Sequence, residues 1–97
     1  MINKFYHHLW GVIHLAALNY KKDDTKKEDI INFYKSLAPI LGCRTCEEHY
    51  IRFMIDNPPN FEDLFGWSVD LHNSVNESRG DRVFTRIETM EYWTRSL

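Results

Sequence analysis

The chain has 97 residues, of which 14% are aromatic, and a formal net charge of −2 at pH 7. This length predicts a single domain over residues 1–97, and aromatic rings help a small core because each one buries a large apolar area. The near-neutral charge and the lack of a long basic run argue against nucleic acid as a partner. No apolar run approaches the roughly 20 residues of a membrane-spanning helix, so no membrane partner is expected.

Apolar side chains recur at helical spacing nearly throughout, and no strand pattern is present. From Phe5 to Tyr20 they repeat every three or four residues, which predicts a first helix of about 17 residues. Thr25 and Glu28 have the spacing of a capping box, which predicts the start of a second helix at Thr25. Pro39 is expected to end that helix, because proline lacks the backbone N–H and clashes with the preceding turn.

A third helix is expected from Cys43 to the Asn-Pro-Pro sequence at residues 57–59. Asn60 together with Asp63 predicts the cap of a fourth helix, and residues 82–93 predict a short fifth. Four helices of similar length with short connections favour an all-α fold, a four-helix bundle with a short fifth helix.

The only two cysteines lie three residues apart, as Cys43-Arg44-Thr45-Cys46, at the predicted start of the third helix. This spacing places the sulfurs one turn apart, close enough for a disulfide. The free N–H groups of a helix start favour a thiolate there, and Arg44 adds positive potential. The pattern is typical of a redox-active dithiol. Structural zinc modules also use it, and two buried helix cysteines can be close by chance.

Histidines accompany the cysteines. His49 follows Cys46 by three residues and shares its helical face. It could be a metal ligand, a proton carrier for the dithiol, one wall of a cofactor pocket, or simply a partly buried side chain. Trp10 and His14 are four apart on the first helix, on a face offset from its main apolar stripe. The alternative for this pair is an ordinary core side chain and one exposed histidine. His7 and the adjacent histidine are expected to be solvated.

The fourth helix carries a polar cluster that packing does not require: His72, Asn73 and Asn76, with Ser68 one turn earlier. If buried, these groups need hydrogen-bond partners, which the edge of a planar heteroaromatic cofactor would provide. The alternative is that the asparagines fray the end of the helix.

These motifs in this order resemble the Erv/ALR family of FAD-linked sulfhydryl oxidases, and the likeness spans roughly residues 8–80. The matching elements are Trp10-x-x-x-His14, the Cys-x-x-Cys of residues 43–46 with His49, Trp67, and His72-Asn-x-Val75-Asn76. The length and the Cys-x-x-Cys-x-x-His form are most similar to stand-alone viral members.

The resemblance implies FAD at one end of the bundle, with Cys46 nearer the flavin and Cys43 meeting the substrate thiolate. The implied reaction forms disulfides in dithiol substrates and passes electrons from the cysteines to FAD and then to O2, giving hydrogen peroxide. The implied FAD site consists of Trp10, His14, Cys46, His49, Tyr50, His72, Asn73, Val75, Asn76, Arg79, Arg82 and Trp93. The two arginines are the only basic groups near the end of the motif, where the family tends to carry lysines.

The resemblance also implies a homodimer through the first helices. Gly42 stands where the family usually has proline, and no second cysteine pair is present as a shuttle. Electrons are therefore expected directly from a dithiol substrate, for example a thioredoxin-like protein. No targeting segment is recognised, so the cytoplasm is the expected location, and the host cytoplasm if the chain is viral or phage-encoded.

The same motifs fit two other classes of protein. Cys43, Cys46, His49 and His72 could form the Cys2His2 site of a zinc-binding structural module, although the chain has enough apolar helix to fold without metal. An alkylhydroperoxidase D type of peroxidase also has a helical Cys-x-x-Cys before a histidine. That family has one more residue before the histidine, and Ile31 stands where its glutamate would be expected.

Overall fold

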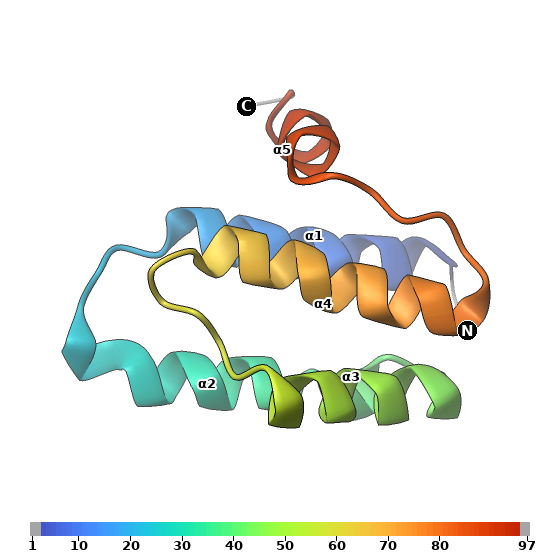
Figure 1. The fold of residues 1–97 in the computed structure, drawn as a ribbon, viewed down its shortest axis with the longest axis horizontal. Helices are drawn as coiled ribbons and strands as arrows, with labels where there is room; N and C mark the ends of the chain where they lie inside the picture. The colour runs from blue at the N-terminus through green and yellow to red at the C-terminus, as the bar shows by residue number, and fades with distance from the viewer. Residues whose placement is uncertain (1–2, 96–97) are drawn as a thin grey trace.

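Helices account for all the regular structure of residues 3–95, the part of the chain that this computed structural model describes (Figure 1). The α-helices are α1 (Asn3–Asn19), α2 (Lys27–Ser36), α3 (Arg44–Asp56), α4 (Leu64–Arg79) and α5 (Arg86–Thr94). Two short 3₁₀ turns, Asp24–Lys26 and Ala38–Ile40, flank α2. The predicted all-α class with a short fifth helix is confirmed.

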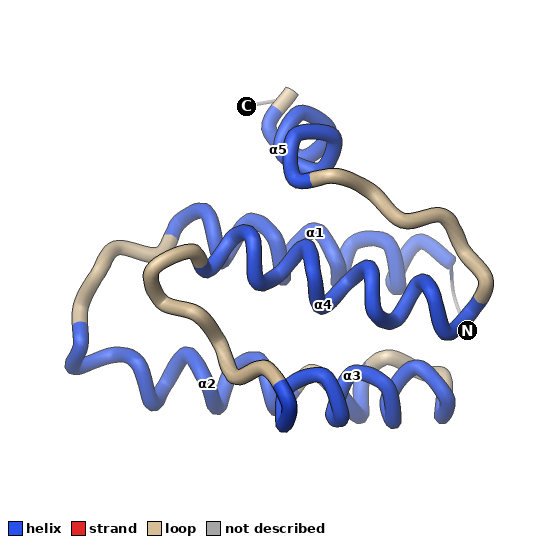
Figure 2. The backbone as a smooth tube through the Cα atoms, in the orientation of Figure 1, coloured by secondary structure: helices blue, strands red, loops and turns tan. Residues whose placement is uncertain are grey.

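The helices are stacked in layers. Helices α1 and α4 run side by side, α2 and α3 form a second layer beneath them, and α5 crosses above, seen nearly end-on in Figure 1. Helix α4 is central because it packs on α1, α3 and α5. A connection over residues 80–85 carries the chain from the end of α4 to α5 (Figure 2). In residues 3–95, no helix combines the length and the apolar character needed to cross a membrane.

The predicted start of the second helix is wrong in detail. The carboxylate of Asp23 accepts bonds from the backbone N–H and the hydroxyl of Thr25, at 3.0 and 2.6 Å. Because this Asx-type turn occupies Thr25, α2 begins only at Lys27, without a side-chain cap. The capping box of this fold is instead the reciprocal pair of Thr85 and Glu88, which starts α5.

The predicted start of the fifth helix at residue 82 is also wrong, because the capping box places the start of α5 at Arg86. The predicted ends of the second and third helices are confirmed. Helix α2 ends at Ser36, before the proline of the following 3₁₀ turn, and α3 ends at Asp56. Asp63 caps α4 by accepting the N–H of the third helical residue at 3.0 Å, whereas Asn60 bonds within the preceding turn. Gly80 closes α4 with φ 72°, a left-handed conformation that glycine adopts without the usual steric cost.

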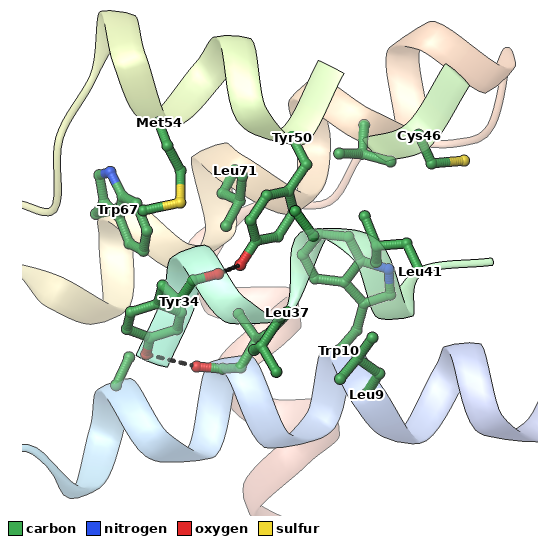
Figure 3. Packing of buried hydrophobic residues seen from close by; sticks show 14 of the residues in the cluster. Leu9, Trp10, Tyr34, Leu37, Leu41, Cys46, Tyr50, Met54, Trp67 and Leu71 are labelled. Atoms are coloured by element: carbon green, nitrogen blue, oxygen red, sulfur yellow. Dashed lines mark hydrogen bonds between the residues drawn. The ribbon is translucent and has the colours of Figure 1, made fainter. Parts of the chain in front are cut away.

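Aromatic side chains join the two layers at the centre of the core (Figure 3). The Tyr34 hydroxyl donates to the carbonyl of Ile13 at 3.0 Å, and the Tyr50 hydroxyl donates to the carbonyl of Tyr34 at 2.5 Å. These bonds link α3 to α2 and α2 to α1. Burial raises the pKa of both hydroxyls, so they stay protonated donors.

Helix α5 makes a close contact with α1 at Gly11. A Cβ atom added to Gly11 would lie 2.5 Å from the nearest ring atom of Trp93, so only glycine on α1 lets the indole ring approach. The ring of His7 also packs against Trp93, with 4.9 Å between ring centroids. This contact sets the position of α5 over α1 and forms one side of the candidate site.

Candidate active site

The two cysteines form a disulfide at the start of α3, with their Cα atoms 5.2 Å apart. Gly42, at φ 74°, turns the chain into the helix, and Cys43 takes the N-cap position with extended backbone. The N–H of Cys46 donates to Cys43 Sγ at 3.3 Å. Cys43 is half-buried, whereas Cys46 is 0% exposed and lies at the edge of the packed cluster (Figure 3). A thiol partner can therefore reach only the sulfur of Cys43.

Arg44 does little for the local charge. Its side chain is 95% exposed and pairs with Glu48 at 3.5 Å, and an exposed ion pair of this kind contributes at most about 1 kcal/mol. The favourable environment for a thiolate therefore comes from the backbone of the helix start.

The buried His14 and the half-buried His72 meet at the α1–α4 contact. His14 Nδ1 lies 3.0 Å from Ser68 Oγ, and His14 Nε2 lies 2.9 Å from His72 Nδ1. The indole of Trp10 stacks on the imidazole of His72, with centroids 4.0 Å apart and planes 4° from parallel. Burial lowers the pKa of His14 to about 4. Burial and then the charge of His14 lower the pKa of His72 to about 3. Both rings are thus neutral near pH 7.

A cavity of about 360 Å³ opens beside His72, between α1, the 80–85 connection and α5. Its walls are aromatic and carry charges of both signs: it is lined by His7, His72, Arg82, Phe84, Glu88, Thr89, Glu91, Tyr92, Trp93 and Arg95. His7 is exposed, as predicted for a solvated residue, but its Nε2 also lies 2.8 Å from the Tyr92 hydroxyl. Sequence reasoning missed His7, Phe84 and Tyr92, because no local spacing links them to the motifs.

The two asparagines neither fray the helix nor point freely into the cavity. Asn73 donates to the carbonyl of Phe84 at 2.7 Å and accepts its N–H at 2.9 Å. The Asn76 amide donates to the carbonyl of Arg82 at 3.0 Å. They hold the 80–85 connection against α4 and so position one wall of the cavity. Val75, between them, is fully buried in the core.

The remaining predicted residues divide between the core and the surface. His49 is exposed, with Nδ1 2.9 Å from the carbonyl of Thr45, and Tyr50 lies in the core with its hydroxyl engaged. Neither lines the cavity. Of the two arginines, Arg79 pairs with Asp81 at 3.2 Å and stays outside the cavity, whereas Arg82 lines it.

The zinc interpretation is not supported. Within residues 3–95, no three histidine, cysteine, aspartate or glutamate side chains gather closely enough to hold a metal ion. Each candidate ligand has another partner. The two cysteines form a disulfide, His49 hydrogen-bonds the carbonyl of Thr45 in its own helix, and His72 hydrogen-bonds His14 on α1.

Residues 7–94 match the Erv1 / Alr family, and the chain belongs to that family. It is 30% identical over 80 residues to the FAD-linked sulfhydryl oxidase ERV1 of Arabidopsis thaliana, which covers 77% of this chain and 42% of the plant protein. It is 27% identical over 96 residues to a probable FAD-linked sulfhydryl oxidase of Acanthamoeba polyphaga mimivirus, covering 91% of this chain and 67% of the viral one. The chain thus spans less than half the length of the plant relative.

The fold is also similar to a solved structure. A double cysteine-to-serine mutant of Erv1 from Saccharomyces cerevisiae superposes with a TM-score of 0.81 at 20% sequence identity. The match covers 100% of this chain and 86% of the yeast one. The predicted four-helix bundle with a short fifth helix is therefore the arrangement seen in a solved Erv1 structure, and the family assignment replaces the peroxidase alternative.

Proposed function

We propose that the chain is an FAD-dependent thiol oxidase that forms disulfides in dithiol substrates through Cys43 and Cys46. The observation that carries this proposal is the one-turn disulfide at the start of α3, with one sulfur accessible and the other fully buried. Both curated relatives described above are named as FAD-linked sulfhydryl oxidases, which supports the same chemistry.

The residues at the α1–α4 contact and in the cavity beside it fit a planar cofactor. The indole N–H of Trp10 has no hydrogen-bond partner among residues 3–95, although the side chain is only 1% exposed. An unpaired buried donor costs about 1–3 kcal/mol, which a ligand acceptor would relieve. Trp10, His72, Arg82 and Trp93 would hold the cofactor, through stacking, hydrogen bonds and charge. Bound FAD supplies the capacity to take two electrons from the reduced cysteines and pass them to O2.

The exposure of the sulfurs gives the order of the thiol steps. A substrate thiolate attacks Cys43 Sγ, the protein S–S bond breaks, and its electron pair leaves on Cys46 Sγ. The second substrate thiolate then attacks the substrate sulfur of the mixed disulfide and releases Cys43 as a thiolate. The substrate is oxidised by two electrons and the protein disulfide is reduced. The amide of Cys46 and the positive end of α3 stabilise the released thiolate.

The substrate in this proposal is a thioredoxin-like or other dithiol protein, with O2 as acceptor and hydrogen peroxide as product. The single cysteine pair favours direct exchange with that substrate. A homodimer through α1 is supported by two exposed apolar side chains, Phe5 at 45% and Val12 at 50%. The cytoplasmic location stays a prediction, to be checked by cell fractionation.

The test is an absorption spectrum of the purified protein, followed by dithiothreitol in air. We expect flavin bands that bleach when oxygen is exhausted, together with hydrogen peroxide in proportion to thiol consumed. A colourless protein that cannot be reconstituted with FAD would contradict the proposal.

A further inference from the structure

A series of hydrogen bonds runs from the carbonyl of Phe65 through Ser68 and His14 to His72, and the position of each hydrogen in it can be assigned. The Ser68 hydroxyl has one hydrogen, and it donates that hydrogen to the carbonyl of Phe65 at 2.6 Å, because a carbonyl can only accept. Ser68 Oγ must then accept from His14 Nδ1, 3.0 Å away. If the hydroxyl turned to the imidazole instead, two oxygen lone pairs would face each other at 2.6 Å.

The assignment carries through both rings. A neutral imidazole has one N–H, so a protonated Nδ1 leaves His14 Nε2 as an acceptor. It accepts from His72 Nδ1 at 2.9 Å, which leaves the lone pair of His72 on Nε2. That atom has no partner among residues 3–95, and His72 lines the cavity.

We propose that Ser68 and His14 are positioning residues that hold His72 with an unprotonated Nε2 at the cavity, so that the site selects a ligand that donates a hydrogen bond there. All the hydrogen bonds in this series donate toward the carbonyl of Phe65, because that carbonyl can only accept. His72 itself would contact the ligand, whereas Ser68 and His14 act through it.

The next step rests on the proposed function. If the ligand is FAD, its chemistry identifies the group that donates to His72 Nε2. The cavity lining contains neither cysteine, and a flavin that exchanges electrons with Cys46 must lie beside that sulfur. The cavity therefore suits the adenosine half. Ribose hydroxyls can both donate and accept, so they do not distinguish an acceptor from a donor. The amino group of adenine does distinguish them, and we assign it as the partner of His72 Nε2.

The first measurement determines which nitrogen of His14 and of His72 carries the proton. It uses ¹⁵N NMR of the full chain labelled at histidine nitrogens, with His72→Asn to assign the signals. We expect His72 Nδ1 to be protonated and Nε2 unprotonated at pH 7. Ser68→Ala removes the acceptor for His14 Nδ1, so both tautomers should reverse. Ser78→Ala is the matched control: Ser78 donates in the same way to the carbonyl of Val75 at 2.6 Å, on the same helix, without an imidazole partner. A protonated His72 Nε2 in the wild-type chain would overturn the proposal, even if Ser68→Ala fails to fold.

The selectivity is measured by fluorescence titration of the full chain with FAD and with its hypoxanthine analogue, in which an oxo group replaces the amino group. The wild-type chain and Ser78→Ala should prefer FAD by at least about tenfold, because the analogue leaves Nε2 facing an acceptor. Ser68→Ala should reduce that preference to about twofold or less, because the donor partner is no longer selected. Equal binding of the two flavins by the wild-type chain would overturn the selection with flavin binding intact. If the chain binds neither FAD nor the analogue, the proposed function and the choice of adenine are both overturned. The ¹⁵N shifts would still show which nitrogen of His72 is protonated.

Discussion

Replacing Gly11 with alanine should detach Trp93 from α1. The added Cβ would lie 2.5 and 2.7 Å from two ring atoms of Trp93, well inside van der Waals contact. The indole is rigid, so the ring and the helix that carries it must move outward by roughly 1 Å. Because Trp93 lines the cavity, the substitution should also weaken FAD retention.

Two opposing effects set the size of the change in stability. Overpacking costs about 1–3 kcal/mol, whereas alanine in place of glycine inside a helix contributes about 1 kcal/mol of stability. The net loss for Gly11→Ala is therefore about 0–2 kcal/mol, too broad a range to test the contact by itself. In a chain that carries Trp93→Ala the clash is absent, and the same substitution should stabilise by about 1 kcal/mol.

The assay is a double-mutant cycle by urea denaturation, over wild type, Gly11→Ala, Trp93→Ala and the double variant. The expected coupling free energy is about 1–3 kcal/mol, equal to the overpacking cost. Flavin occupancy of each purified variant provides a second readout, which should fall in Gly11→Ala. A coupling below about 0.5 kcal/mol would show that Gly11 and Trp93 do not meet in solution, and would refute this placement of α5.

Three further outcomes are expected. Cys43→Ser should leave a Cys46 thiolate beside oxidised flavin and produce a long-wavelength charge-transfer absorbance. Seeing that band in Cys46→Ser instead would reverse their roles. Asn73→Asp should cost about 1–3 kcal/mol, because a carboxylate then faces the carbonyl to which the amide donated, and limited proteolysis should cut the 80–85 connection sooner. Stability should be full above pH 6.5 and fall as the pH drops below 6.5, by up to about 1.4 kcal/mol per pH unit for each of His14 and His72. The loss continues to about pH 4 for His14 and about pH 3 for His72, because folding lowers their pKa values and the unfolded chain therefore takes up protons first. The charged and titratable groups that face the His72 ring or its cavity are His7, His14, Arg79, Arg82, Glu88, Glu91, Tyr92 and Arg95. His72→Asn should reduce the slope measured by urea titration at several pH values, and an unchanged slope would contradict this origin.

The sequence by itself determined the helices and the redox pair. Periodic apolar residues, Pro39 and the Asn-Pro-Pro stop act within a few residues of the chain, so their consequences are visible without a fold. The spacing of Cys43 and Cys46 likewise places their sulfurs one turn apart in any helix that starts there. The error at Thr25 was also local, since Asp23 competes for the same backbone groups.

Only the tertiary structure decided what the polar motif residues contact. His14 and His72 are 58 residues apart and meet because α1 packs on α4, and Asn73 bonds the backbone of Phe84 instead of fraying its helix. Periodicity states which face of a helix is apolar, but it carries no information on which helix covers that face. The direction of the hydrogen-bond chain and the cavity under α5 depend on that choice of partner, and so they follow from the packing of the helices.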